Sequence, residues 1–80
     1  MIKYYIDSKL VRTSKVATYT HAVININPNN NEWYVKSLCS GIDKAEKALT
    51  NAINTYNRDV KQGAKFDYVP RFELVELVKA

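Results

Sequence analysis

The feature that most constrains this fold is one long amphipathic segment, residues 42–62. Its apolar side chains recur three or four positions apart, as they do on one face of an α-helix. They are Ile42, Ala45, Leu49, Ala52, Ile53, Tyr56 and Val60. Ser40 and Asp43 have the spacing of a capping box, with Ser40 as the N-cap residue. Gly63 suits the left-handed position that ends a helix. The sequence therefore predicts one long helix between these two ends.

The rest of the chain has the character of β-strands. Alternating and β-branched residues predict strands over residues 2–6, 10–14, 20–27, 32–39 and 72–78. The last segment also fits a short helix, but Pro70 prevents a helix from running in from Val69, which favours a strand. We therefore expect one α+β domain over residues 1–80, in the order β-β-β-β-α-β. Its two layers are a mostly antiparallel sheet and the long helix, packed on one face.

The first two predicted strands form a hairpin. A tight turn at residues 8–9 places Ile6 opposite Val11 and Tyr5 opposite Arg12. This pairing gives the hairpin one apolar face and one mixed face.

The next two predicted strands form a second hairpin around the loop at residues 28–31. Pairing Asn27 with Glu32 sets the register, which then joins Ile26 with Trp33, Ile24 with Val35, Asn25 with Tyr34 and Val23 with Lys36. This hairpin also has one apolar and one mixed face.

The two faces of the predicted sheet differ in chemistry. We expect the helix to cover the apolar face, formed by Ile2, Tyr4, Ile6, Val11, Ala22, Ile24, Ile26, Trp33 and Val35. The other face then has no predicted cover. It carries Lys3, Tyr5, Arg12, Ser14, His21, Val23, Asn25, Tyr34, Lys36 and Leu38, a set with no acidic side chain.

This open face is the predicted binding surface. We expect the contacts to come from Lys3, Tyr5, Arg12, His21, Tyr34 and Lys36. Tyrosine and arginine beside exposed Val23 and Leu38 are typical of protein interfaces. The sequence therefore favours a small binding protein whose partner is another protein.

Two alternatives use nearly the same residues. In a DNA- or RNA-binding module the cations neutralise phosphates and the tyrosines stack on bases. In a homodimer the face is sealed by a second copy. By size and architecture alone, the chain is similar to compact accessory proteins of bacteriophages and mobile elements, some of which, as anti-CRISPR proteins do, block a surface of a host protein.

Catalytic chemistry has little support in the sequence. Cys39 precedes the helix and His21 lies on the paired strand, with Thr20 expected opposite Cys39, but alternation points the two side chains apart. One cysteine and one histidine cannot make a four-ligand zinc site. No pair of carboxylates is placed for acid–base work. We therefore expect no enzyme activity and no cofactor.

The segment 67–71, which contains Tyr68 and Arg71, is interpreted as a connection back to the sheet rather than as a recognition loop. The chain shows no apolar stretch long enough to span a membrane and no signal peptide at its start. We therefore expect a cytoplasmic protein without membrane contact.

Overall fold

The computed structural model describes residues 1–15 and 18–80, and it confirms the α+β class. Its elements are β1 (Ile2–Ile6), β2 (Lys9–Ser14), β3 (His21–Ile26), β4 (Trp33–Cys39), α1 (Ile42–Lys61), β5 (Arg71–Glu76) and β6 (Val78–Lys79). The long helix and the first four strands lie where the sequence predicts them. The ambiguous last segment is extended, as favoured, and is divided between β5 and β6.

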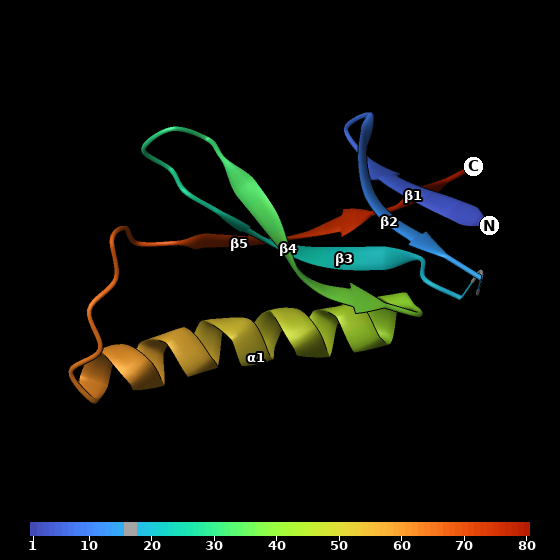
Figure 1. Ribbon diagram of the computed structural model, residues 1–80. Coiled ribbons are helices and arrows are strands. Elements are labelled where there is room, and N and C mark those ends of the chain that lie inside the picture. The colour runs from blue at the N-terminus through green and yellow to red at the C-terminus, as the bar shows by residue number, and fades with distance from the viewer. Residues whose placement is uncertain (16–17) are drawn as a thin grey trace.

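The strands form two antiparallel three-stranded sheets, with the orders β2-β1-β6 and β4-β3-β5. The chain passes from one sheet to the other at Leu77, whose N–H donates to the carbonyl of Thr20 at 2.9 Å. Beyond it, Lys3 and Ala80 exchange two backbone hydrogen bonds, each of 2.9 Å. In Figure 1 the β2-β1-β6 sheet lies above the β4-β3-β5 sheet, and α1 lies below it.

The main apolar core lies between the two sheets. It is built from Ile6, Ala22, Ile24 and Ile26, and the partly buried side chains packed against it are Val11, Trp33, Val35, Leu38, Val75 and Leu77. The apolar face of β3 and β4 is therefore covered by the β1–β2 hairpin. The expectation that α1 covers this face is wrong, because the hairpin buries its own apolar side chains, Ile6 and Val11, against it.

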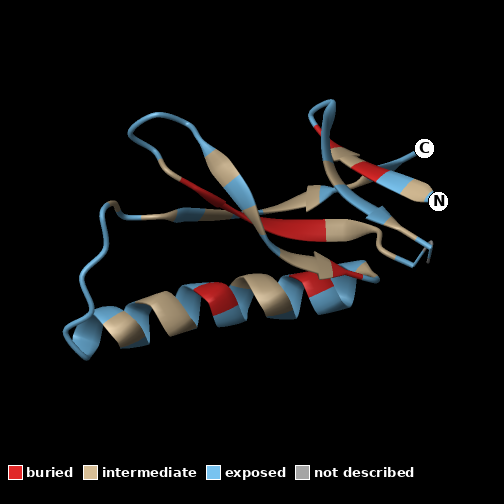
Figure 2. Ribbon diagram, viewed as in Figure 1, coloured by how far each residue is buried: buried red, intermediate tan, exposed pale blue. Residues whose placement is uncertain are grey.

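The helix packs instead on the opposite face of the β4-β3-β5 sheet. Val23 and Asn25 are buried there, and Ala45 and Ala52 are the buried residues of the helix. Small alanine side chains allow a helix to approach a sheet closely. Figure 2 shows the result: β3, the central strand of its sheet, is the most continuously buried element.

The first hairpin differs from its predicted register. Its turn is Asp7-Ser8, with φ of 49° and 66°, which matches the left-handed pair that two-residue hairpin turns prefer. Ile6 therefore lies opposite Lys9, and an irregularity between Tyr4 and Tyr5 places Tyr4 opposite Arg12. The predicted Ile6–Val11 and Tyr5–Arg12 pairs are wrong.

The second hairpin follows its predicted register as far as Ile24. Ile26–Trp33, Asn25–Tyr34 and Ile24–Val35 are confirmed, and the N–H of Asn27 donates to the carbonyl of Glu32 at 2.7 Å. The register then shifts between Val23 and Ile24, so Val23 lies opposite Ser37 rather than Lys36. The shift also moves Leu38 opposite Ala22 and into the apolar core, so its predicted place on the open face is wrong.

The N-terminal cap of α1 is not the predicted capping box. The N-cap residue is Gly41, with φ of 125° and no side-chain cap. Its N–H donates to Oγ1 of Thr20 at 2.8 Å, and the same oxygen lies 2.7 Å from Nδ1 of His21. Thr20 therefore ties the start of the helix to β3. At the other end, Gly63 has φ of 90°, as predicted.

This tie gives a test of the fold. Thr20→Val keeps the shape of the side chain but removes the acceptor of the Gly41 N–H, so we expect it to lower the free energy of unfolding by about 1–2 kcal/mol. Ser40→Ala is the control, because Ser40 is exposed and only its contact with Lys44 is lost. We expect that variant to change stability by less than about 0.5 kcal/mol in urea titrations. Equal losses in both variants would mean that Ser40 caps the helix.

Candidate functional site

The structure divides the six predicted site residues among four places. Lys3 and Tyr5 lie on the outer face of the β2-β1-β6 sheet, the face turned away from the core. Their cross-strand partners on this face are Thr13, Leu10 and Val78. Leu10 is 48% exposed and Val78 is 63% exposed. None of the described elements packs over this face (Figure 1).

The net charge of the chain belongs to the same sheet. Residues 1–15 and 78–80 contain five Lys or Arg side chains and one acid, Asp7. Residues 16–77 contain seven basic and seven acidic side chains. The formal charge of +4 therefore comes entirely from the β2-β1-β6 sheet and its flanking residues, which we call the basic sheet.

The cations of the basic sheet are arranged around its rim as well as on its outer face. Arg12 lies opposite Tyr4 rather than Tyr5, and its guanidinium stands 5.9 Å from the ring centre of Tyr19. The ammonium of Lys9 lies 4.8 Å from the ring centre of Trp33. Lys3 therefore stands beside Tyr5 on the outer face, while Arg12 and Lys9 contact aromatic rings at the edges.

His21 lies beside the start of α1, away from the basic sheet's outer face. It is half-buried and opposite Cys39 in the strand register, so the two side chains share a face of the sheet. The prediction that they point apart is wrong, because the bulge between Val23 and Ile24 moves Cys39 from opposite Thr20 to opposite His21. Burial raises the pKa of the Cys39 thiol, and the positive charge of Lys44 opposes this only in part. A protonated, buried thiol is a weak nucleophile.

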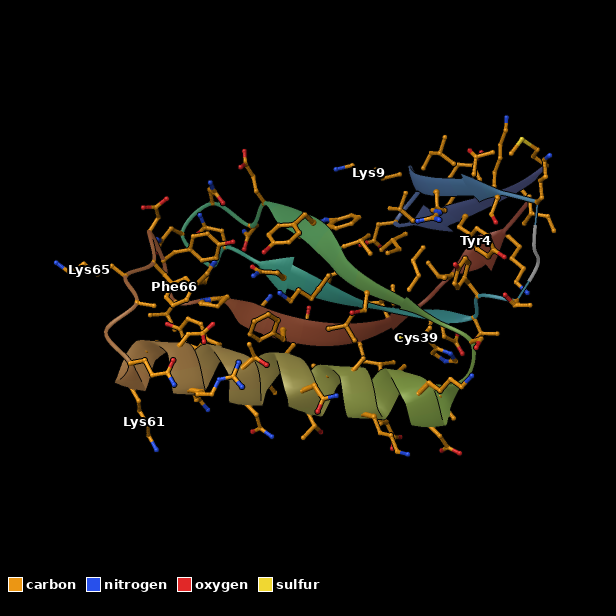
Figure 3. All side chains as sticks on the ribbon, turned by 60° about the horizontal axis from the view of Figure 1, so that its bottom comes forward. Tyr4, Lys9, Cys39, Lys61, Lys65 and Phe66 are labelled. Carbon is orange, nitrogen blue, oxygen red and sulfur yellow. The ribbon has the colours of Figure 1, made fainter. Side chains whose placement is uncertain are left out.

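Tyr34 and Lys36 lie on the helix side of the β4-β3-β5 sheet. They line a cleft of about 290 Å³ between this sheet, the second half of α1 and the segment 65–70. We call it the aromatic cleft, and its other lining residues are Asn25, Ala52, Thr55, Tyr56, Asp59, Lys65, Phe66, Asp67, Tyr68, Pro70 and Phe72. Figure 3 shows Phe66 beside the end of α1 and Lys65 pointing outward from the same segment.

A buried amide organises the polar wall of the aromatic cleft. Nδ2 of Asn25 donates to the hydroxyl of Tyr34 at 3.0 Å, and Oδ1 of Asn25 accepts from the hydroxyl of Tyr68 at 2.8 Å. Desolvation raises the pKa of Tyr68, and Tyr34 and Asp67 raise it further. Asn25 thereby joins the central strand to β4 and to the segment after the helix.

Aromatic packing forms the opposite wall of the cleft. The ring centres of Tyr56 and Phe66 are 4.9 Å apart, and those of Tyr56 and Phe72 are 6.4 Å apart. The sequence prediction included Tyr34 and Lys36 but missed the rest of this site, because residues 67–71 were interpreted as a connection rather than as a recognition loop. The available signal was the density of aromatic residues from Tyr56 to Phe72.

No protein-family model, curated protein or solved structure matches this chain. Within residues 1–15 and 18–80, no helix is both long and apolar enough to cross a membrane. The candidate surfaces therefore rest on the chain's own geometry. They are the basic sheet and the aromatic cleft.

The raised pKa of Tyr68 makes the stability of the protein depend on pH. Because the folded state raises the pKa of Tyr68, the stabilisation is fully present below its unfolded value and is lost as pH rises through the folded value. We expect Tyr68→Phe to lower the urea midpoint at neutral pH. The difference from the unmodified protein should shrink in alkaline solution, where the ionised hydroxyl can no longer donate to Asn25. A difference that stays constant with pH would contradict this role.

Proposed function

We propose that this chain acts by binding another protein through the outer face of the basic sheet, without catalysis. The observation that carries the proposal is that one sheet has both the net charge, with Lys3 on its outer face and Arg12 and Lys9 at its edges, and an uncovered face with exposed apolar side chains. The basic sheet holds all of the net charge, and its outer face exposes Leu10 and Val78 beside the half-buried Tyr5. Exposed apolar side chains within a charged rim are typical of protein interfaces.

The charge of the basic sheet indicates the chemistry of the partner. A cluster of Lys and Arg attracts an acidic surface over a distance and raises the rate of association. The apolar centre then supplies affinity through burial, with Tyr5 as the expected anchor because tyrosine is frequent among interface hot spots. The partner therefore has an acidic surface with an apolar depression. Blocking such a surface on a host protein, as some bacteriophage proteins do, is one way in which so small a domain acts.

Two further candidates share the face. The concentration of charge also favours a nucleic-acid partner, in which the cations neutralise phosphates. The exposed Leu10 and Val78 also suit a second copy of the chain. The protein partner is preferred over nucleic acid because these apolar side chains have no counterpart on a phosphate backbone.

Point substitutions test which face binds. We expect Tyr5→Ala and Leu10→Ser to weaken capture of the partner from a lysate of the source cells by at least about tenfold. Tyr34→Ala is the control, because it also removes a tyrosine ring from an accessible surface, but Tyr34 lies in the aromatic cleft. Capture should survive nuclease treatment. Loss of capture in Tyr34→Ala but not in Tyr5→Ala would place the interface elsewhere and end the proposal.

Salt dependence separates the partner classes. A protein partner held by apolar contacts should lose affinity only mildly with salt. A single-stranded nucleic acid that engages all five cations of the basic sheet should show a slope of log K against log salt of about −3.5. Light scattering over a dilution series tests the homodimer, since a monomer at every concentration removes it. A steep slope on a dT oligonucleotide, abolished by Lys3→Ala and Arg12→Ala together, would replace the protein partner by nucleic acid.

A further inference from the structure

We propose that the aromatic cleft is a second binding site and that it takes a proline-rich peptide segment in the polyproline II conformation. This inference goes beyond the proposed function, because the cleft uses different residues on a different layer. The basic sheet packs on one side of the β4-β3-β5 sheet, and the cleft lies on the helix side.

Aromatic rings are concentrated in the cleft. The chain has nine aromatic residues, and five of them line this cleft: Tyr34, Tyr56, Phe66, Tyr68 and Phe72. Tyr34 is 52% exposed and Phe66 is 49% exposed, so their rings are accessible from outside. Grooves lined by aromatic rings bind proline-rich segments, because the flat rings pack against pyrrolidine rings.

The polar wall of the cleft has a hydrogen-bond donor that no described residue uses. The hydroxyl of Tyr34 accepts from Asn25, so its own proton is left to donate. The hydroxyl of Tyr68 donates to Oδ1 of Asn25, which fixes the orientation of the amide and holds Tyr34 in place. A polyproline II segment has no internal hydrogen bonds and presents backbone carbonyls to its surroundings. The free O–H of Tyr34 is therefore matched to a peptide carbonyl.

The charged side chains that line the cleft balance one another. The cleft is lined by two basic side chains, Lys36 and Lys65, and by two acidic ones, Asp59 and Asp67. This balance gives no net attraction for a polyanion, in contrast to the basic sheet, and it disfavours a nucleic acid as the occupant. An uncharged peptide segment meets no electrostatic repulsion in the cleft.

The volume of the cleft limits the size of its occupant. The volume of about 290 Å³ is at the lower end of small-molecule sites, which span about 300–1,000 Å³. A cleft of this size has room for the side chains of a short peptide anchor rather than for a large cofactor. Binding of a preformed polyproline II helix also loses little conformational entropy, which favours recognition by a small surface.

An NMR titration tests this site directly. The probe is an oligoproline peptide of about ten residues, which is uncharged and adopts polyproline II. We expect saturable chemical-shift changes at Tyr34, Tyr56, Phe66 and Tyr68, unchanged by added salt, and none at Tyr5. A Gly-Ser peptide of equal length is the control and should cause no saturable change.

Variants of the cleft complete the test. Phe66→Ala should weaken oligoproline binding by at least about tenfold, whereas Val69→Ala, in the same segment but outside the cleft lining, should change it by less than about twofold. Tyr34→Phe keeps the ring and loses the donor, so a loss of about fivefold is expected. Urea midpoints of each variant show that the fold is kept.

Several outcomes would overturn the site. They are the absence of saturable shifts up to millimolar peptide, equal shifts with the Gly-Ser peptide, or shifts centred on Tyr5. A dT oligonucleotide that moves the cleft resonances when oligoproline does not would replace the peptide by a nucleic acid. The first two results leave the proposed function of the basic sheet standing, because it is tested by Tyr5→Ala and Leu10→Ser, whereas shifts centred on Tyr5 would move the peptide to the basic sheet.

Discussion

The fold depends on the burial of β3 on both of its faces. This strand is central in its sheet, between β4 and β5, and Ala22 to Ile26 are all buried. A strand whose two faces are both shielded from water needs a cover on each side. The β1–β2 hairpin provides one cover over Ala22, Ile24 and Ile26, and α1 with Tyr34 and Tyr68 provides the other, on the side of Val23 and Asn25. Both covers are amphipathic, so each leaves a different outer surface.

The C-terminal segment joins the two layers. β5 pairs with β3 in one sheet, and β6 pairs with β1 in the other, with Leu77 between them in the core. Its N–H is bonded to the carbonyl of Thr20, whose hydroxyl oxygen accepts from the first residue of the helix cap. A chain of this length buries only about 60% of its unfolded surface. The contacts of Thr20, which link the start of β3, the connection at Leu77 and the start of α1, therefore contribute a large share of the stability of the fold.

Local pattern predicted the elements well and their packing poorly. The helix followed from the spacing of Ala45, Ala52 and Tyr56, and the second hairpin followed from the Asn27–Glu32 pair, because both signals are short-range. The two irregularities, at Tyr4/Tyr5 and at Val23/Ile24, have no marker such as glycine, and each moves side chains to the other face of a strand. They displaced Arg12 and Leu38 from the predicted surface.

The residues of the predicted binding surface lie on separate faces for a different reason. Tyr5 and Tyr34 both alternate toward the mixed face of their own hairpins, and a single sheet would place them together. In two sheets packed apolar face to apolar face, the two mixed faces point in opposite directions. Sequence alone shows that each hairpin has such a face. It does not show whether the hairpins lie side by side or stack, because long-range pairing with β5 and β6 decides that.

The same stacking separates the two candidate sites electrostatically. The molecule is 42 Å long, and Figure 1 places the basic sheet near the start of α1, whereas the segment that closes the aromatic cleft follows its other end. The Debye length at physiological ionic strength is about 8 Å, so charges on the basic sheet have little influence at the far end of the cleft. The field of the basic sheet therefore acts at one end, while the charges of the cleft at the other end, from Lys36, Lys65, Asp59 and Asp67, are balanced. Occupation of the two proposed sites is therefore compatible in space and independent in charge.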